Sequence, residues 1–228
     1  AEMAIAAAKA GKHIICEKPL ARNAADAKEM YDAVKNSNII HMVAFNYRRT
    51  PAVALAKKLI NDNKIGDILN FRGTYLQDWP ADPNGPLSWR FQKEVAGSGS
   101  LGDIGTHVID FARYLVGEIS SVNAITKTYV ESRPIQQSVN DTMDIRVGNT
   151  GAEKAKVDVD DEVITMLKFS NATGCAVYVI TTETNGDNPN ILTGIVGDDN
   201  EKWTNYVKVE RYGSVSFTKT QSTVWQNV

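Results

Sequence analysis

The fold of this chain is decided by the stretch His13-Ile14-Ile15-Cys16-Glu17-Lys18-Pro19, in which a short apolar run ends in a charged pair and a proline. Short, continuous apolar runs are typical of buried strands in parallel sheets. Charged residues directly after such a strand lie at its carboxyl end, where open α/β sheets bind ligands. The stretch therefore predicts a strand over 13–16 and a ligand-binding turn at Glu17 and Lys18. A surface turn is the alternative, and the sequence leaves open whether Lys18–Pro19 is cis.

The residues around this stretch alternate between helix and strand patterns. An alanine-rich segment that ends at Gly11 precedes it, and the chain is expected to begin inside that helix as the later part of a longer protein. Asn23 is a suitable N-cap for a helix to about Asn36, and an apolar strand is expected over 39–45. This αβαβ order predicts the remnant of a doubly wound α/β sheet.

After residue 48 the pattern changes to a helix followed by strands. Pro51 suits the first position of a helix to Asn63, and residues 68–79 alternate apolar with polar as an antiparallel strand does. A proline-rich loop over 79–95 precedes a helix over 103–116. Further strands are expected over 121–129, 161–169, 175–182, 191–196, 206–210 and 214–220, whereas 148–156 has the least ordered pattern. The second part is therefore predicted to be an α+β domain with a mainly antiparallel open sheet.

A second motif, Gly102-Asp103-Ile104-Gly105-Thr106-His107, opens the predicted helix. Residues at i and i+4 share a helical face, so the carboxylate and the imidazole lie on one side. An acidic residue complementing the helix dipole beside a structural histidine is one alternative. A metal pair is another, although His13 and His41 are isolated and no third ligand lies at a suitable spacing. Together with Lys18, the motif indicates a proton-transfer site.

The run Gly97-Ser98-Gly99-Ser100-Leu101-Gly102 matches the glycine pattern of dinucleotide-binding turns. No buried strand precedes it, and no βαβ unit with a ribose-binding acid follows. We therefore expect a flexible loop that lets its backbone approach a ligand and that aims the next helix.

Three other polar groups each admit two interpretations. Asn46 and Arg48 follow the strand over 39–45, so they either reach the ligand crevice or form an exposed linker. Trp89-Arg90 suits stacking on a ring and pairing with phosphate, or packing as a loop plug. The acidic cluster 158–162 is expected to be a solvated strand edge, and no metal site is predicted.

The composition and charge of the chain argue against several classes of function. The chain has 228 residues, 43% of them hydrophobic, and a net charge of −2, which argues against nucleic-acid or anionic-membrane binding. No apolar run approaches the roughly 18 residues that a membrane span needs, and no signal peptide is evident. Two cysteines, Cys16 and Cys175, imply no disulfide framework; both are expected to be small buried residues in a cytoplasmic protein.

In combination, these motifs resemble those of the Gfo/Idh/MocA family of NAD(P)-dependent oxidoreductases. The resemblance is carried by residues 7–19, 78–90 and 97–110. It implies that Lys18, Asp103 and His107 are catalytic and also contact substrate, together with Arg48. It further implies that the cofactor, NAD or NADP, is contacted by Glu17, Lys18, Pro19, Asn46, Trp89 and Arg90.

The family implies transfer of hydride between NAD(P) and a hydroxyl or carbonyl of a sugar or cyclitol. It also implies a Rossmann remnant over 1–48 and a substrate-binding, oligomerising domain over 49–228 whose C-terminal end is expected to be incomplete, with homo-oligomers forming through the open sheet face. The family's glycine-rich first turn is absent from this chain, so the segment alone is expected to be inactive. The alternative is a non-catalytic carbohydrate-binding or dimerisation module of the same fold.

Overall fold

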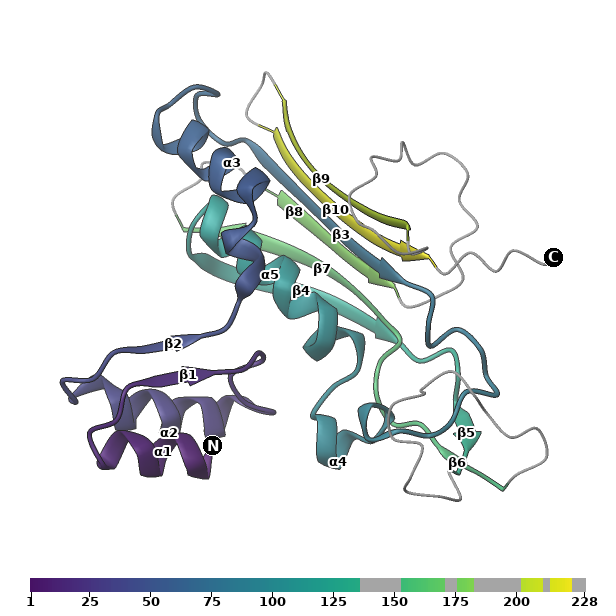
Figure 1. Cartoon of the computed structure of the whole chain (residues 1–228). Coiled ribbons are helices and arrows are strands. Elements are labelled where there is room, and N and C mark those ends of the chain that lie inside the picture. The colour runs from purple at the N-terminus through teal and green to yellow at the C-terminus, as the bar shows by residue number, and fades with distance from the viewer. Residues whose placement is uncertain (136–152, 171–175, 183–201, 211–213, 223–228) are drawn as a thin grey trace.

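The computed structural model describes residues 1–135, 153–170, 176–182, 202–210 and 214–222. Its first part contains helix α1 (Glu2–Lys9), strand β1 (Ile14–Cys16), helix α2 (Ala24–Lys35) and strand β2 (His41–Val43). The side chain of Asn23 caps α2 by accepting a hydrogen bond from the Asp26 amide at 2.9 Å, as its position predicted. β1 and β2 pair in parallel, with α1 and α2 packed together beside them (Figure 1). The N-terminal part is therefore a fragment of a Rossmann-like layer.

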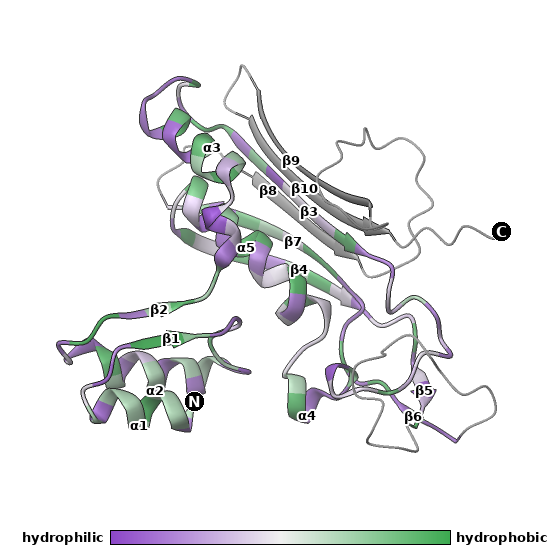
Figure 2. Ribbon diagram, viewed as in Figure 1, coloured by the Kyte–Doolittle hydropathy of each residue, from purple (hydrophilic) through white to green (hydrophobic). Residues whose placement is uncertain are grey.

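The prediction that the strand over 13–16 is buried was wrong. β1 is apolar along its length (Figure 2), yet the Ile15 side chain is 76% exposed. Cys16, expected to be buried, is half-buried. Two strands covered by helices on one side leave the other side open, and strands of this composition are normally covered on both.

The second part begins with a short 3₁₀ turn, η1 (Asn46–Arg49), and contains most of the strands. After η1 come α3 (Pro51–Asn61), β3 (Asn70–Gln77), the 3₁₀ turn η2 (Trp89–Phe91), α4 (Lys93–Ala96), the π-helical turn η3 (Leu101–Gly105) and α5 (Thr106–Leu115). The remaining strands are β4 (Ile119–Lys127), β5 (Ser132–Pro134), β6 (Lys154–Lys156), β7 (Glu162–Phe169), β8 (Ala176–Thr182), β9 (Lys202–Glu210) and β10 (Ser214–Ser222).

Six of these strands form one sheet in the order β4-β7-β8-β3-β10-β9. The pairs β4–β7, β7–β8 and β9–β10 are antiparallel, so the sheet is mainly antiparallel, as predicted. β3 itself was predicted to be an antiparallel strand, but it runs parallel to both of its neighbours, β8 and β10. Alternating hydrophobicity reports that one face of a strand is covered, and it carries no information about the direction of the neighbours.

Helices α3 and α5 cover one face of this sheet (Figure 1). α5 was predicted as one helix from 103, whereas the structure begins it with the π-helical turn η3 that holds Asp103. The core between the helices and the sheet consists of these apolar side chains: Val53 and Ala56 of α3, Ile104 of η3, Val108, Phe111, Ala112 and Leu115 of α5 with the following Val116, Phe71 and Tyr75 of β3, and Leu167 and Phe169 of β7. This layer fixes the position of α5, which carries His107.

A second, smaller hydrophobic cluster organises the proline-rich loop. Phe91, Val157 and Val159 form it, with Trp79 packed alongside. Arg133 is 1% exposed, lies over the Phe91 ring at 4.0 Å, and donates hydrogen bonds to the carbonyl oxygens of Pro80 and Asp82. The loop predicted over 79–95 is thus held from inside and contains the turns η2 and α4.

One further expectation is corrected by the structure, and two concern residues that the structure does not describe. Residues 154–156, expected to be poorly ordered, form β6, which pairs antiparallel with β5. The strand predicted over 191–196 and residue Cys175 lie outside the described residues. Within the described part of the chain, no helix has the length and apolar character required to cross a bilayer.

Candidate functional site

Lys18 and Asp103 form the centre of the site. Lys18 Nζ donates to Asp103 Oδ1 at 2.9 Å and to the Asp103 carbonyl oxygen at 2.7 Å. The two side chains are 20% and 40% exposed, so the ion pair is accessible from solvent. The lysine is the second residue after β1 and its peptide bond with Pro19 is cis, whereas the aspartate comes from η3 in the second part of the chain. The pair therefore joins the end of the Rossmann-like strand to the start of the α5 segment.

His107 lies near this pair, in the first turn of α5, and is 5% exposed. Its imidazole stacks on the Tyr47 ring, with 4.2 Å between centroids and 25° between planes. The Phe45 ring meets it edge-on at 5.8 Å, and the Tyr75 ring is tilted against it at 6.3 Å. Aromatic side chains from η1, from β3 and from the segment between β2 and η1 thus fix the plane of the imidazole.

A cleft of about 680 Å³ brings these groups together. It is lined by Glu17, Lys18, Ala44, Asn46, Tyr47, Tyr75, Gln77, Asp103, Ile104 and His107. The Tyr47 and Tyr75 hydroxyls lie 3.3 Å apart, Gln77 donates to the Tyr75 hydroxyl at 3.3 Å, and Trp79 donates to Gln77 at 3.1 Å. The wall of the cleft is thus a line of hydroxyl and amide groups next to an ammonium, a carboxylate and an imidazole, which suits a polyhydroxylated ligand.

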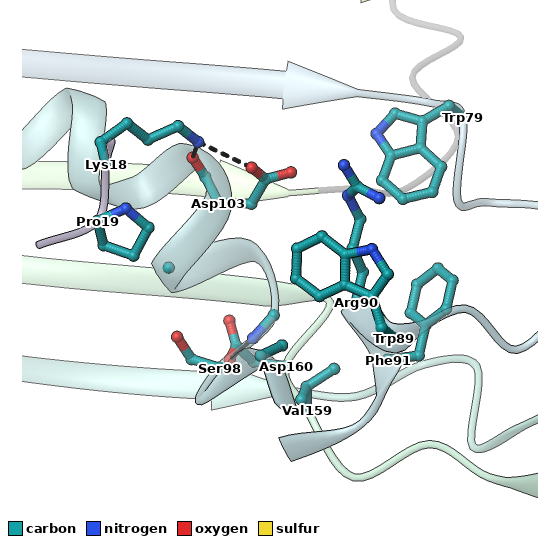
Figure 3. A pocket seen from close by; sticks show the side chains of 13 residues that line it. Lys18, Pro19, Trp79, Trp89, Arg90, Phe91, Ser98, Asp103, Val159 and Asp160 are labelled. Carbon is teal, nitrogen blue, oxygen red and sulfur yellow. Dashed lines mark hydrogen bonds and ion pairs between the residues drawn. The ribbon is translucent and has the colours of Figure 1, made fainter. Parts of the chain in front are cut away.

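Lys18 and Asp103 also border a second cavity, of about 550 Å³, whose lining side chains are drawn in Figure 3. Its walls include Pro19, Trp79, Trp89 and Arg90. The Arg90 guanidinium lies over the Trp89 indole at 4.4 Å, and Trp89 is 52% exposed. The Lys18–Asp103 pair therefore borders two cavities, one rich in hydroxyl and amide groups and one rich in aromatic surface.

The loop over 97–102 is held by the acidic cluster, and Ser98, Gly99 and Gly102 also line a wall of the second cavity. The Asp160 carboxylate accepts hydrogen bonds from Gly99 N at 2.9 Å, Leu101 N at 2.7 Å and Ser100 Oγ at 3.0 Å. A Cβ atom at Gly99 would lie 2.0 Å from the Asp160 carbonyl oxygen, so the close approach that needs glycine is to the protein's own backbone. The prediction of a flexible loop is corrected to an anchored one, whereas the approach of its backbone to a ligand stays a prediction.

The acidic cluster 158–162 also differs from the expected solvated strand edge, because some of its carboxylates accept hydrogen bonds from backbone amides. Asp161 is 3% exposed and accepts hydrogen bonds from the amides of Tyr129 and Val130, and Asp158 accepts one from Lys93 N. A solvated strand edge was therefore the wrong interpretation for Asp161, which is buried and accepts from two loop amides, whereas Asp158 is exposed. In the parts of the chain that the structure describes, no three histidine, cysteine or acidic side chains gather in a way that suits a metal ion.

Arg48 is the one expected ligand residue that lines neither cavity. Its guanidinium makes two hydrogen bonds to Asp110, with Nε 2.7 Å from Oδ2 and Nη2 2.5 Å from Oδ1. The other expected site residues do line one cavity or both: Glu17, Lys18, Pro19, Asn46, Trp89, Arg90, Asp103 and His107.

Sequence reasoning missed three residues that line the cleft, Tyr47, Tyr75 and Gln77. Tyr47 was detectable, because it stands between Asn46 and Arg48 in a run already expected to reach the crevice. Tyr75 and Gln77 were not, because alternate residues of β3 face the same side of the sheet and nothing in the sequence identifies which of them meet the cleft.

Two family models match the chain in succession. Residues 1–45 match an oxidoreductase family model with an NAD-binding Rossmann fold, and residues 53–199 match the GFO/IDH/MocA C-terminal domain. The chain belongs to the GFO/IDH/MocA family. The fold expected from the sequence, a Rossmann fragment followed by a domain with a mainly antiparallel sheet, is that of the family's solved structures.

Two of the relatives to which the chain is similar are sugar dehydrogenases. The chain is 58% identical to levoglucosan dehydrogenase of Pseudarthrobacter phenanthrenivorans over 222 residues, which is 97% of this chain and 56% of that protein. It is 33% identical to glucose-6-phosphate 3-dehydrogenase of Bacillus subtilis over 144 residues, which is 61% of this chain and 41% of that protein. The chain thus spans about half the length of the curated relatives that it matches.

A solved structure of levoglucosan dehydrogenase in complex with NADH and levoglucosan superposes on the chain with a TM-score of 0.72. The two sequences are 61% identical, and the superposition covers 82% of this chain and 45% of that one. The superposition shows that the chain shares the fold of that part of the protein.

Proposed function

We propose that this chain is the catalytic segment of an NAD-dependent sugar dehydrogenase, with Lys18, Asp103 and His107 as its catalytic residues. The observation that carries the proposal is the convergence of these three side chains on one cleft, where Lys18 reaches Asp103 across 85 residues of sequence. The 58% identity to a levoglucosan dehydrogenase supports it independently. A lysine, a carboxylate and a histidine gathered in one cleft would have no evident use in a non-enzymatic module.

In this proposal His107 removes the proton from the substrate hydroxyl that becomes the carbonyl. Imidazole is suited to this role because its ordinary titration lies near neutral pH. The Lys18 ammonium, held by Asp103, lies where it stabilises negative charge that develops on the same oxygen. NAD, when bound, supplies the hydride acceptor. The stacked rings around His107 keep its reacting edge in a fixed plane, which lowers the orientational cost of the proton transfer.

We assign the aromatic cavity to the cofactor side and the polar cleft to the sugar. Trp89 presents an exposed indole with Arg90 stacked upon it, a surface that fits a flat ring or an adjacent phosphate. Pro19, which lines the aromatic cavity, completes the proposed cofactor contacts there. Glu17 and Asn46 line the polar cleft, so we propose that the cofactor reaches them where the two cavities meet at Lys18. Gln77 and the Tyr75 hydroxyl, which line the other cleft, suit the hydroxyl groups of a sugar. Levoglucosan or a closely related anhydro sugar is the substrate that we propose.

We also propose that residues 1–48 belong to the cofactor-binding domain and 49–228 to a substrate-binding and self-associating domain. Self-association is supported by the face of the sheet opposite α3 and α5. Ile125 and Ile164 are directly paired across β4 and β7 and are 71% and 36% exposed, with Met166 at 46% beside them. Exposed apolar side chains gathered on one face are typical of interfaces.

The experiment that tests the proposal is a turnover assay of the protein expressed from its complete gene. Levoglucosan and a panel of other sugars are supplied with NAD or NADP, and the absorbance of the reduced cofactor is followed. We expect reduction of NAD by levoglucosan or a related anhydro sugar. Failure to bind either cofactor, measured by tryptophan fluorescence, would instead favour a non-catalytic carbohydrate-binding or dimerisation module.

A further inference from the structure

Two adjacent residues of η1 hold two positions on α5 that lie one helical turn apart. Arg48 makes its two hydrogen bonds to Asp110, and Tyr47 stacks on His107. His107 and Asp110 stand at positions i and i+3 of α5, so they are neighbours on the helix surface. The ion pair and the ring stack therefore act on the same short contact between η1 and α5.

The Arg48–Asp110 pair has the geometry of a strong, directional contact. Both guanidinium hydrogen bonds are 2.7 Å or shorter, and the Asp110 side chain is only 7% exposed. Arg48 also lies over the Tyr114 ring at 4.9 Å, which restricts the guanidinium from a further side. Donation of hydrogen bonds to the Asp110 carboxylate raises the pKa of Arg48 above its already high value, so the guanidinium is charged at every working pH.

η1 is a four-residue turn with no side-chain cap, and the side chains of its residues contact the neighbouring elements. Tyr47 packs against the main core, and its hydroxyl lies 3.3 Å from that of Tyr75. Arg48 adds the ion pair with Asp110 on α5. We expect these side-chain contacts to set the orientation of so short a 3₁₀ turn. Because Tyr47 is the residue immediately before Arg48, movement of the anchored guanidinium moves the ring that stacks on His107.

We propose that the Arg48–Asp110 pair is a positioning device that holds the Tyr47 ring against His107 and thereby sets the plane of the imidazole. The inference rests on the proposed role of His107 as the base. Neither Arg48 nor Asp110 contacts the reacting atoms; both act through Tyr47. Misplacement of a catalytic group by about 1 Å can cost about 100-fold in rate, so loss of the pair is expected to appear in kcat rather than in KM.

The test is a set of variants of the protein expressed from its complete gene, assayed with its best sugar and NAD. Arg48→Lys keeps the charge but removes the forked geometry, and we expect it to lower kcat about 10- to 100-fold with KM for both substrates changed less than about threefold. Arg113→Lys is the matched control, because Arg113 lies on α5, the helix of Asp110, and makes two hydrogen bonds to Glu118 at the surface. We expect the control to retain the original kcat.

A double-mutant cycle separates positioning from general damage. Tyr47→Leu keeps bulk but removes the flat ring, and if Arg48 acts through Tyr47, the double variant loses about as much kcat as Tyr47→Leu alone. Losses that multiply would overturn the proposal, as would an Arg48→Lys variant with unchanged kcat or with only a raised KM. If Arg48→Lys fails to fold, Asp110→Asn, which preserves the shape of the carboxylate, takes its place in the cycle.

A parallel His107→Ala variant distinguishes failure of this inference from failure of the proposed function. Unchanged turnover in His107→Ala would remove the base itself. Collapsed turnover in His107→Ala together with normal kcat in Arg48→Lys and Asp110→Asn would leave the function in place and reject the positioning role.

Discussion

Lys18 Nζ lies 2.9 Å from Asp103 Oδ1 although 85 residues separate the two in the sequence. The contact joins the carboxyl end of β1 to the turn η3, and it borders both the aromatic cavity and the polar cleft. Because the two side chains are partly exposed, the pair contributes little to stability. Its position between the two cavities is therefore better explained by chemistry than by folding.

Replacement of Lys18 by methionine is expected to abolish most turnover while the fold persists. Methionine keeps much of the length of the side chain but removes the ammonium that we assign to charge stabilisation at the substrate oxygen. We expect kcat to fall at least about 100-fold, with an unfolding midpoint close to that of the original protein. Lys28→Met is the control, since Lys28 pairs with Asp32 on the exposed side of α2 at 2.5 Å and lies in neither cavity. Equal activities in the two variants would contradict the role of Lys18.

Asp160 is expected to be a stability residue for the loop that leads into η3. Asp160→Asn removes the charge and one of the acceptor oxygens that serve Gly99, Ser100 and Leu101. Charge-assisted hydrogen bonds to partly buried amides suggest a loss of about 2–3 kcal/mol in the free energy of unfolding, measured by urea denaturation. The exposed Lys58–Asp62 pair offers the comparison, because Asp62→Asn should cost less than about 0.5 kcal/mol.

Gly99→Ala should destabilise the same loop by a different cause. The added Cβ would lie 2.0 Å from the Asp160 carbonyl oxygen, so the two backbone segments have to separate. We expect a loss of about 1–3 kcal/mol in the free energy of unfolding and a fall in turnover, since Asp103 N is bonded to Gly99 O at 3.0 Å. Gly105→Ala is the matched control. Its Cβ would find its nearest neighbour at 3.4 Å in a helical turn, and a cost as large as that at Gly99 would refute the steric explanation.

The exposed sheet face gives a prediction about assembly. Ile164→Lys places a charge at the centre of the apolar group formed with Ile125 and Met166, and burial of an unpaired charge in an interface is costly. We expect the protein expressed from its complete gene to be oligomeric by light scattering, and this variant to be smaller. Ser120→Lys, at an exposed position near the end of β4, should leave the mass unchanged. An unchanged mass in the Ile164 variant would exclude this face as the interface.

The parts of the fold that follow from local pattern were predictable from the sequence. The capping Asn23, the proline that begins α3 and the short apolar run of β1 each specify an element through its own residues. The direction of β3 was not predictable, because the parallel partners β8 and β10 come from distant parts of the chain. Likewise, the exposure of Ile15 depends on which layers cover β1 and not on its own composition.

In the candidate site, too, some residues could be predicted from the sequence and others could not. Lys18, Asp103 and His107 were identifiable as a set because their order and spacing resemble a family pattern. Asp160 and Arg48 were interpreted incompletely, because a charged residue at a loop looks the same in sequence whether it is solvated or bonded to a segment 60 residues away. Only the three-dimensional contact distinguishes these cases.

The most direct test of the account is turnover by His107→Ala in the protein expressed from its complete gene, together with the dissociation constant for NADH. Removal of a general base that takes the proton during hydride transfer should lower kcat about 100- to 10,000-fold and leave NADH affinity within about threefold. That result is the one the account predicts. Turnover that equals that of the unaltered protein would contradict the assignment of the cleft as the active site.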